Sequence, residues 1–251
     1  MAAETPFLSV AITAYNEARR IAPSLQRIVS YLDAQGFPYE IVVNDDGSRD
    51  ETAAIVRGFP CPHIKLIVAP TNQGKGAGVR RAILHSSGEF ILFTDADLST
   101  PIEEVEQLLA KLQGPYDVAI GSRLQPDGSD LRASQPIYRR MLGKFFHLIA
   151  WLLVVRGVRD TQAGFKCFRR APAHRLFAMA VLHSIMFDVE ILYLAQKLGY
   201  RIAEVPVAWT NAAGSRMRVT PKHAITVLGD LLRIRRLHSD RTLSAERQRE
   251  A

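Results

Sequence analysis

The sequence predicts an α/β domain built on a mostly parallel sheet with helices on both faces. Short apolar runs rich in β-branched residues alternate with segments whose apolar residues recur at intervals of three and four. The 251 residues are 47% hydrophobic and 23% charged, which is typical of a globular protein with a substantial core. The chain shows no internal repeat and no Pro/Gly/Ser-rich linker. We therefore expect one domain over residues 1–230 and a basic tail over 231–251.

Six strands are expected where mainly apolar runs are bounded by turn residues, at 8–14, 40–44, 64–69, 90–94, 118–120 and 202–207. Five helices are expected at 17–32, 50–56, 75–85, 102–112 and 187–198. Asp50 and the Thr100-Pro101 pair are typical of residues that begin a helix. Because helices follow the strands, the strands should run mostly parallel. The half that begins near Pro136 should be more helical.

Charge and cysteine content narrow the possible functions. The 32 Lys and Arg residues against 25 Asp and Glu give a net charge of +7, which favours an anionic partner: nucleic acid, a phosphorylated ligand or a membrane surface. Cys61 and Cys167 are far apart and have no metal-ligand spacing, which argues against a zinc site and a disulfide-built secreted fold. With no signal-peptide pattern at the N-terminus, we expect a cytoplasmic protein.

Polar clusters follow three of the expected strands. They are TAYNE at 13–17, DDGS at 45–48 and DAD at 95–97. In an open α/β sheet, ligands bind beyond the carboxyl ends of the strands, so these clusters should meet in one crevice. The spacing of Asp95 and Asp97 places both carboxylates on one side of an extended segment, which suits Mg²⁺ or Mn²⁺ holding a diphosphate. The alternative for each cluster is a solvated turn or a helix cap.

The glycine segment at 72–78, NQGKGAG, has two open interpretations. Its spacing is neither that of a P-loop nor that of a dinucleotide-binding turn, so an ATPase and a dehydrogenase are disfavoured. It is either a tight loop that opens a helix near a phosphate or a plain glycine-rich turn.

In their order and spacing, these motifs and GSR at 121–123 resemble family-2 glycosyltransferases of the GT-A fold. DTQAGFK at 160–166, FDVEIL at 187–192, EVPV at 204–207 and GSR at 214–216 resemble the polyprenyl-phosphate hexosyltransferase branch of that family. The resemblance covers about residues 7–220. It implies inverting transfer of a hexose, glucose from UDP-glucose, to a polyprenyl or dolichyl phosphate. The alternatives are GDP-mannose as donor and a soluble hydroxyl compound as acceptor.

The resemblance also implies roles for individual residues. The nucleotide would be bound by Tyr15, Glu17, Asp45 and Asp46, and the diphosphate by Asp95 and Asp97. From their places in the same strand-end clusters and glycine segment, we expect Thr13, Lys75 and Ala96 to contact the nucleotide sugar as well. Asp95 and Asp97 would hold the metal, Mg²⁺ or Mn²⁺. Arg123 and Arg216 would meet the donor or acceptor phosphates. Because two polyanions must be brought together, Arg139, Arg140 and Lys166 are further candidates for the acceptor phosphate, and we expect Asp97, Arg123 and Asp188 to be the catalytic residues.

Four positions depart from the family pattern. Thr13 stands where relatives often have Pro, and Asn44 stands where an aliphatic residue precedes the Asp pair. Ser99 stands where the mannosyl branch often has a Gln. Residues 212–213 are both Ala and lack an Arg that the same branch often carries there. The last two departures favour UDP-glucose over GDP-mannose.

A basic and apolar window lies at 132–159, where six Lys or Arg residues occur without Asp or Glu. Its centre, about 137–155, predicts a helix lying at an anionic membrane surface, where a lipid phosphate would be found. The alternatives are a core helix and a homodimer interface. The longest apolar run, 145–155, is too short to span a bilayer. An uninterrupted apolar block of this kind argues against a nucleic-acid partner. From the basic apolar helix, we expect a peripheral protein on the cytoplasmic face of the membrane.

The chemistry of the acceptor decides whether a base is needed. A lipid monophosphate, with a second pKa of about 6, is already a nucleophile at neutral pH. A hydroxyl acceptor would need a general base, for which Asp188 or Glu190 is the candidate.

Overall fold

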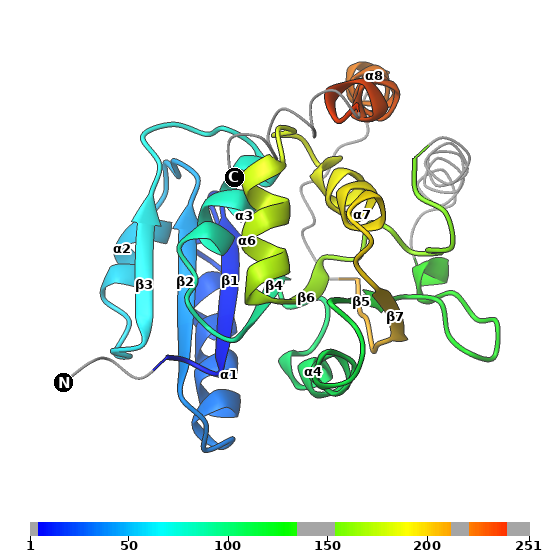
Figure 1. Cartoon of the computed structure of the whole chain (residues 1–251). Helices are drawn as coiled ribbons and strands as arrows, with labels where there is room; N and C mark the ends of the chain where they lie inside the picture. Colours follow the sequence, from blue (N-terminus) through cyan, green and yellow to red (C-terminus); the bar gives the residue numbers. More distant parts are fainter. Residues whose placement is uncertain (1–4, 135–153, 212–220, 240–251) are drawn as a thin grey trace, which may run out of the picture.

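The computed structural model describes residues 5–134, 154–211 and 221–239. Within them, seven strands form one sheet in the order β3-β2-β1-β4-β6-β5-β7 (Figure 1). The strands are β1 (Leu8–Ala14), β2 (Tyr39–Asp45), β3 (Ile64–Val68), β4 (Phe90–Asp95), β5 (Val118–Ser122), β6 (Phe165–Arg169) and β7 (Ile202–Pro206). The six expected strands are all present, and the α/β fold class is confirmed.

Helices alternate with these strands in the described residues. The α-helices are α1 (Ile21–Asp33), α2 (Thr52–Arg57), α3 (Lys75–Leu84), α4 (Val105–Gln113), α6 (Arg170–Met179), α7 (Phe187–Lys197) and α8 (Pro221–Leu237). Two 3₁₀ turns, η1 (Ile102–Glu104) and η2 (Leu131–Ser134), complete the set. Helices α6 and α8 were not individually predicted.

Strand β6 is the main departure from the predicted topology. It runs antiparallel to both of its neighbours, β4 and β5, whereas β3, β2, β1 and β4 are parallel to one another and β5 is parallel to β7. Its sequence, FKCFR, carries Lys166 at its second position, and that side chain is buried in the fold. Because lysine is rarely buried, Lys166 interrupts the apolar run that would have predicted a strand here.

Helix α1 begins at Ile21, four residues later than expected. The backbone before it is instead hydrogen-bonded to the segment that follows β2. The amide of Asn16 donates to Ser48 Oγ at 2.8 Å, and that of Glu17 donates to Thr52 Oγ1 at 2.7 Å. These donors therefore fix the end of β1 against the segment that follows β2. Helix α2 likewise begins at Thr52, whose amide donates to the carboxylate of Asp50 at 3.1 Å.

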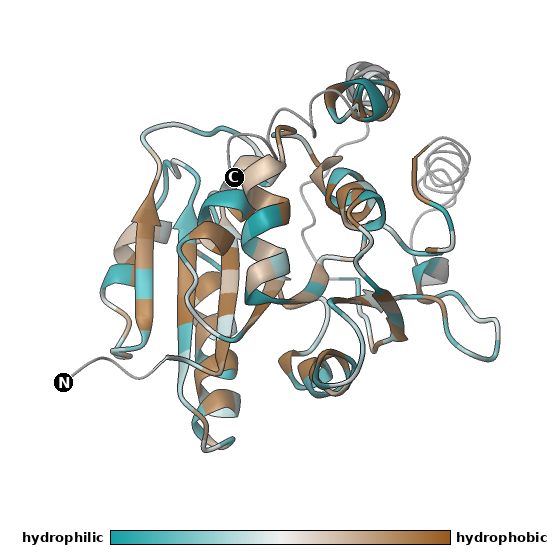
Figure 2. Ribbon diagram, viewed as in Figure 1, coloured by the Kyte–Doolittle hydropathy of each residue, from teal (hydrophilic) through white to brown (hydrophobic). Residues whose placement is uncertain are grey.

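Two apolar clusters fill the two faces of the sheet. One includes Val79 of α3, Leu176 of α6 and Leu192 of α7, and the other includes Leu25 of α1 and Leu108 of α4. Figure 2 shows the strands largely brown, with teal concentrated on loops and helix faces. The sheet is therefore covered on both sides, and its edge at the carboxyl ends of the strands is left for polar residues.

No described helix has both the length and the hydropathy that a membrane span requires. Most of the helix predicted at about 137–155 lies outside the described residues. Val154 and Val155, at its end, are buried in the same apolar cluster as residues of α6 and α7.

Candidate functional site

The carboxyl ends of β1, β2 and β4 lie side by side. Thr13 of β1 is in register with Asn44 of β2 on one side and with Asp95 of β4 on the other. Because these strands are parallel, the segments after them leave the sheet at one edge. The structure thereby brings the TAYNE, DDGS and DAD clusters together.

The Asp pair at the end of β2 is buried, and it accepts hydrogen bonds from the loops around it. Asp45 accepts hydrogen bonds from the amide and the hydroxyl of Ser48. One oxygen of Asp46, Oδ2, accepts the backbone amides of Gln73 at 3.0 Å and Gly74 at 2.9 Å. The other oxygen, Oδ1, is buried without a hydrogen-bond partner among the described residues, and Arg81 Nη1 lies 3.8 Å from it. This oxygen is an acceptor that a ligand N–H can satisfy.

The glycine segment at 72–78 includes the first turn of α3, and other parts of the fold pack directly against its backbone. A Cβ on Gly78 would lie 2.2 Å from Thr13 Oγ1, and one on Gly76 would lie 2.3 Å from the carbonyl oxygen of Leu182. Gly74 has a φ of 101°, in the region that favours glycine. This close packing positions Lys75, whose ammonium is 2.8 Å from Asp95 Oδ1. The segment thus brings a cation to the carboxyl end of β4.

Asp95 is the last residue of β4, and Asp97 follows it two residues later. A Cβ on Gly164 would lie 2.0 Å from Asp95 Oδ2, so only glycine leaves room for this carboxylate. Asp97 Oδ1 accepts the amide of Ser99 at 3.0 Å, and Asp97 Oδ2 lies 3.8 Å from Arg20 Nη1. Leu98 has a φ of 46°, a left-handed conformation that costs about 1 kcal/mol for a residue with a Cβ.

Asp95 and Asp97 offer oxygens of the kind that divalent metal ions prefer. The described residues contain no group of three or more metal-ligating side chains. Asp95 and Asp97 supply hard carboxylate oxygens, and Gly164 leaves the space in which the Asp95 carboxylate sits. Mg²⁺ and Mn²⁺ are bound in this way by one or two carboxylates, with phosphate oxygens and water completing the coordination.

A buried chain of alternating charges runs inward from Lys75. Lys166 is 1% exposed, and its ammonium lies 2.6 Å from Asp188 Oδ1. Burial raises the pKa of Asp188 above its ordinary value, although the charges of Lys166 and Lys75 oppose this shift. Burial lowers the pKa of Lys75, but the charges of Asp95 and Asp188 outweigh it and raise that pKa overall. The placement of Lys166 favours a role in holding Asp188 over its predicted contact with the acceptor phosphate.

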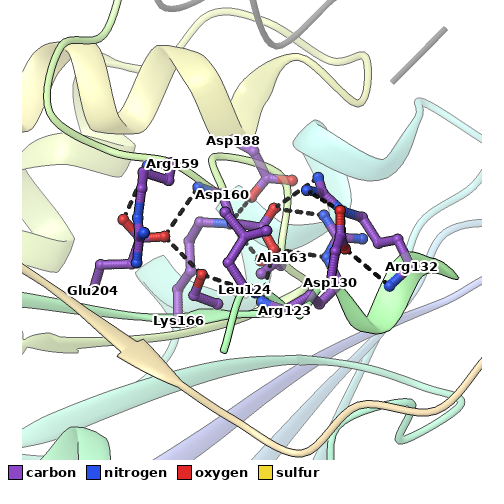
Figure 3. Close-up of polar contacts among 11 residues, drawn as sticks. Arg123, Leu124, Asp130, Arg132, Arg159, Asp160, Ala163, Lys166, Asp188 and Glu204 are labelled. Carbon is purple, nitrogen blue, oxygen red and sulfur yellow. Dashed lines mark hydrogen bonds and ion pairs between the residues drawn. The ribbon is translucent and has the colours of Figure 1, made fainter. Parts of the chain in front are cut away.

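Arg123 is held by a second network, drawn in Figure 3. Its Nε and Nη2 donate to the two oxygens of Asp160 at 2.7 and 2.6 Å, and its guanidinium lies 5.7 Å from the ring of Trp209. Burial raises the pKa of Asp160, but the hydrogen bonds and charge of Arg123 prevail and lower it to about 2. Arg132 lies 3.9 Å from the same carboxylate. Arg123 is therefore fixed in one orientation by a bidentate ion pair.

The remaining residues predicted to bind the donor differ in exposure and in their contacts. Tyr15 is exposed, Ala96 is buried, and Glu17 forms an ion pair with Arg20 at 2.7 Å. Arg139, Arg140 and Arg216 lie outside the described residues. Sequence reasoning gave no role to Arg20, Arg81, Asp160 or Gly164. The last two belong to the DTQAGFK motif, which could have drawn attention to them, whereas the two arginines have no local signal.

Comparison with known proteins adds independent information. A family model described as Glycosyl transferase family 2 matches residues 9–177. The dolichyl-phosphate beta-glucosyltransferase of Dictyostelium discoideum is 39% identical over 91% of this chain and 74% of its own. The Homo sapiens protein of that name is 37% identical over 85% and 70%. The crystal structure of glucosyl-3-phosphoglycerate synthase from Mycobacterium tuberculosis with Mn²⁺, UDP and glucosyl-3-phosphoglycerate matches at a TM-score of 0.62, with 18% identity over 94% of this chain and 82% of its own. This structural likeness shows the fold.

Proposed function

The chain belongs to glycosyl transferase family 2, and from this premise we propose that it transfers glucose from UDP-glucose to a polyprenyl or dolichyl phosphate with inversion. The observation that carries the proposal is its identity of 37–39% to dolichyl-phosphate beta-glucosyltransferases over most of the chain. The cluster of carboxylates at the strand ends supports the proposal, because its charges and acceptors suit a nucleoside diphosphate with a cation.

The proposed donor site lies along the ends of β1, β2 and β4. Asp46 Oδ1, buried and without a hydrogen-bond partner among the described residues, is the acceptor for an N–H of the base. The other proposed donor contacts are Thr13, Tyr15, Glu17, Asp45, Lys75, Asp95 and Ala96. Asp95 and Asp97 would hold Mg²⁺ or Mn²⁺, which stabilises negative charge on a leaving diphosphate. Lys75 adds a fixed positive charge beside the same oxygens.

The proposed acceptor requires positioning more than proton removal. A phosphate monoester is ionised at neutral pH and attacks as it stands, so Asp188 can remain paired with Lys166. Two polyanions must nevertheless be brought together. Arg139, Arg140 and Arg216 remain our candidates for the acceptor phosphate, since arginine binds phosphate through two parallel hydrogen bonds. Arg123, locked by Asp160, would present a guanidinium of fixed orientation to the reacting phosphates.

We also propose peripheral contact with the cytoplasmic face of a membrane, and α8 offers a surface for it. Leu228 and Leu232 are exposed large apolar side chains one turn apart, and Arg235 and Arg236 follow at exposed positions. Asp230 faces inward and accepts a hydrogen bond from Ser184 Oγ at 2.6 Å. An exposed face of leucine and arginine is typical of a helix lying on anionic lipid.

The test is transfer of label from radiolabelled UDP- and GDP-sugars to a short polyprenyl phosphate with Mn²⁺ or Mg²⁺, counted in the organic phase. We expect label from UDP-glucose and none with Asp97→Ala, whose fold is checked by circular dichroism. Label only from GDP-mannose would change the donor to GDP-mannose. Donor turnover without lipid labelling would indicate a soluble acceptor and refute the lipid-phosphate proposal.

A further inference from the structure

We propose that Glu190 is a positioning residue for the donor site, acting through segment 181–184 on the glycine segment that carries Lys75. This inference rests on the proposed donor site, and it assigns that site a supporting residue that does not itself contact the donor. The sequence marked Glu190 as an alternative general base. Its surroundings indicate another role.

Glu190 lies on the first turn of α7 and is 0% exposed. Its Oε1 accepts the amide of Val181 at 3.1 Å, and its Oε2 accepts the amide of Leu182 at 3.0 Å. His238 Nε2 lies 2.7 Å from Oε1. Both carboxylate oxygens are therefore engaged by buried donors, and the side chain fixes the backbone of the segment between α6 and α7.

The segment held by Glu190 forms one wall against the glycine segment. The carbonyl oxygen of His183 accepts the amide of Gly76 at 2.9 Å. A Cβ on Gly74 would lie 2.5 Å from that same oxygen, and one on Gly76 would lie 2.3 Å from the carbonyl oxygen of Leu182. The two backbones are thus in direct contact with no intervening side chain. A shift of segment 181–184 must be transmitted to residues 74–76.

The glycine segment carries the charge that faces the donor. Lys75 lies between the two closely packed glycines and reaches Asp95 Oδ1 at 2.8 Å. On its other side, the amide of Gly74 donates to Asp46 Oδ2 at 2.9 Å. The position of Lys75 is consequently set from one side by Asp46 and from the other by segment 181–184, which Glu190 holds.

Helix α8 supports the same segment from outside. His238 follows this helix and contacts Glu190, while Asp230 within it accepts the hydroxyl of Ser184 at 2.6 Å. Lys197 at the end of α7 donates to the carbonyl oxygen of His238 at 2.6 Å. These contacts are far in sequence from the strand ends, so the donor site depends on the C-terminal part of the fold.

Glu40 provides a matched control for Glu190. It is also a buried carboxylate that accepts a backbone amide, from Ser87, and a cation, Lys65, lies beside it. It lies on β2 opposite Ser9, toward the start of the strands rather than their carboxyl ends. Glu190→Gln should lower the Tm because its two oxygens each accept a backbone amide and a Gln side chain has only one oxygen. Glu40→Gln should lower the Tm less, because its buried donors share one oxygen and the change removes only the charge beside Lys65.

The experiment measures the Kd of UDP in the presence of Mn²⁺ by calorimetry for the wild-type chain and both variants. Glu190→Gln should raise the Kd of UDP by about fivefold, equivalent to one hydrogen bond, while Glu40→Gln leaves it unchanged. In the transfer assay, Glu190→Gln should raise the KM for the donor more than it lowers kcat. A larger effect on kcat than on donor KM would contradict the positioning role.

Ser184→Ala tests the same segment with a milder change if Glu190→Gln does not fold, and a raised Kd for UDP is expected. An unchanged Kd in either folded variant would overturn the proposal. If the wild-type chain binds neither UDP nor GDP, the donor site of the proposed function is refuted and this proposal with it.

Discussion

Asp95 is positioned by contacts from two distant parts of the chain. Lys75 lies 2.8 Å from one of its oxygens, and Gly164, at the start of the segment that leads into β6, leaves space for the other. The observed position of the Asp95 carboxylate therefore requires that residue 164 have no side chain. Glycine there is required by close approach, since 164 does not carry a positive φ.

Gly164→Ala should move the carboxylate of Asp95, because the added Cβ would lie 2.0 Å from its Oδ2. We expect kcat/KM for transfer to fall by roughly a hundredfold, as follows from misplacing a group at a reacting centre. Steady-state kinetics with varied Mn²⁺ measure the effect.

Gly58→Ala is the matched control for Gly164→Ala. A Cβ on Gly58 would lie 3.5 Å from the carbonyl oxygen of Ala54, an ordinary contact. This variant should retain wild-type kinetics. Equal kinetics in the two variants would contradict the role of Gly164 in seating Asp95.

Helix α8 has two faces with different tasks. Its inner face carries Asp230, Leu231 and Ile234, which are buried against the rest of the fold. Its outer face carries Leu228, which is 37% exposed, and Leu232, which is 55% exposed. Burying such leucines in lipid instead of water would stabilise a bound state by about 1 kcal/mol or more each.

Arg235→Glu with Arg236→Glu should weaken membrane binding, because each reversal replaces attraction to anionic headgroups by repulsion. Each basic residue near an anionic surface contributes about 1 kcal/mol to the free energy of membrane binding. We therefore expect the fraction of protein that floats with phosphatidylglycerol vesicles to fall by roughly tenfold or more. Arg57→Glu with Lys111→Glu, at exposed positions on α2 and α4, is the charge-matched control. Equal flotation of the two variants would remove α8 from the membrane contact.

Strand β6 connects the part of the sheet that carries Asp95 with the part that leads to Arg123. It lies between β4, which ends at Asp95, and β5, which precedes Arg123, and it is antiparallel to both strands. The connection before it contains Asp160, and its own Lys166 holds Asp188. The Arg123–Asp160 pair therefore ties the β5 and β6 segments together, and its strength should be seen in the stability of the folded chain.

Asp160→Asn should destabilise the chain at pH 7 by about 2 kcal/mol, because the pKa of Asp160 is lowered to about 2 in the folded state. A lowered pKa stabilises the folded chain above the unfolded value near 4, and this contribution is lost as the pH falls from about 4 to about 2. The difference between wild-type and variant unfolding free energies in urea should shrink over that interval. A difference independent of pH would refute the assignment.

Local patterns in the sequence were sufficient to predict most of the sheet and the acidic residues at its edge. Apolar periodicity predicted six of the seven described strands, and the ordered motifs placed the carboxylates of Asp46, Asp95 and Asp97 at the strand ends. These features are readable because strand periodicity and turn chemistry depend on neighbouring residues. The family followed from the same motifs, and the comparisons confirm it.

Only the tertiary structure decided which buried charges are paired. Arg123 bonds to Asp160, Lys166 to Asp188, and Glu190 contacts His238 across 48 residues. No spacing encodes these choices, since a buried ion takes whichever partner the packing brings within hydrogen-bond distance. For the same reason, β6 was missed, because its lysine reads as a surface residue until Asp188 is seen beside it. The sequence thus determined the sheet and the acids at its edge, whereas packing determined which charged groups remain available to a ligand.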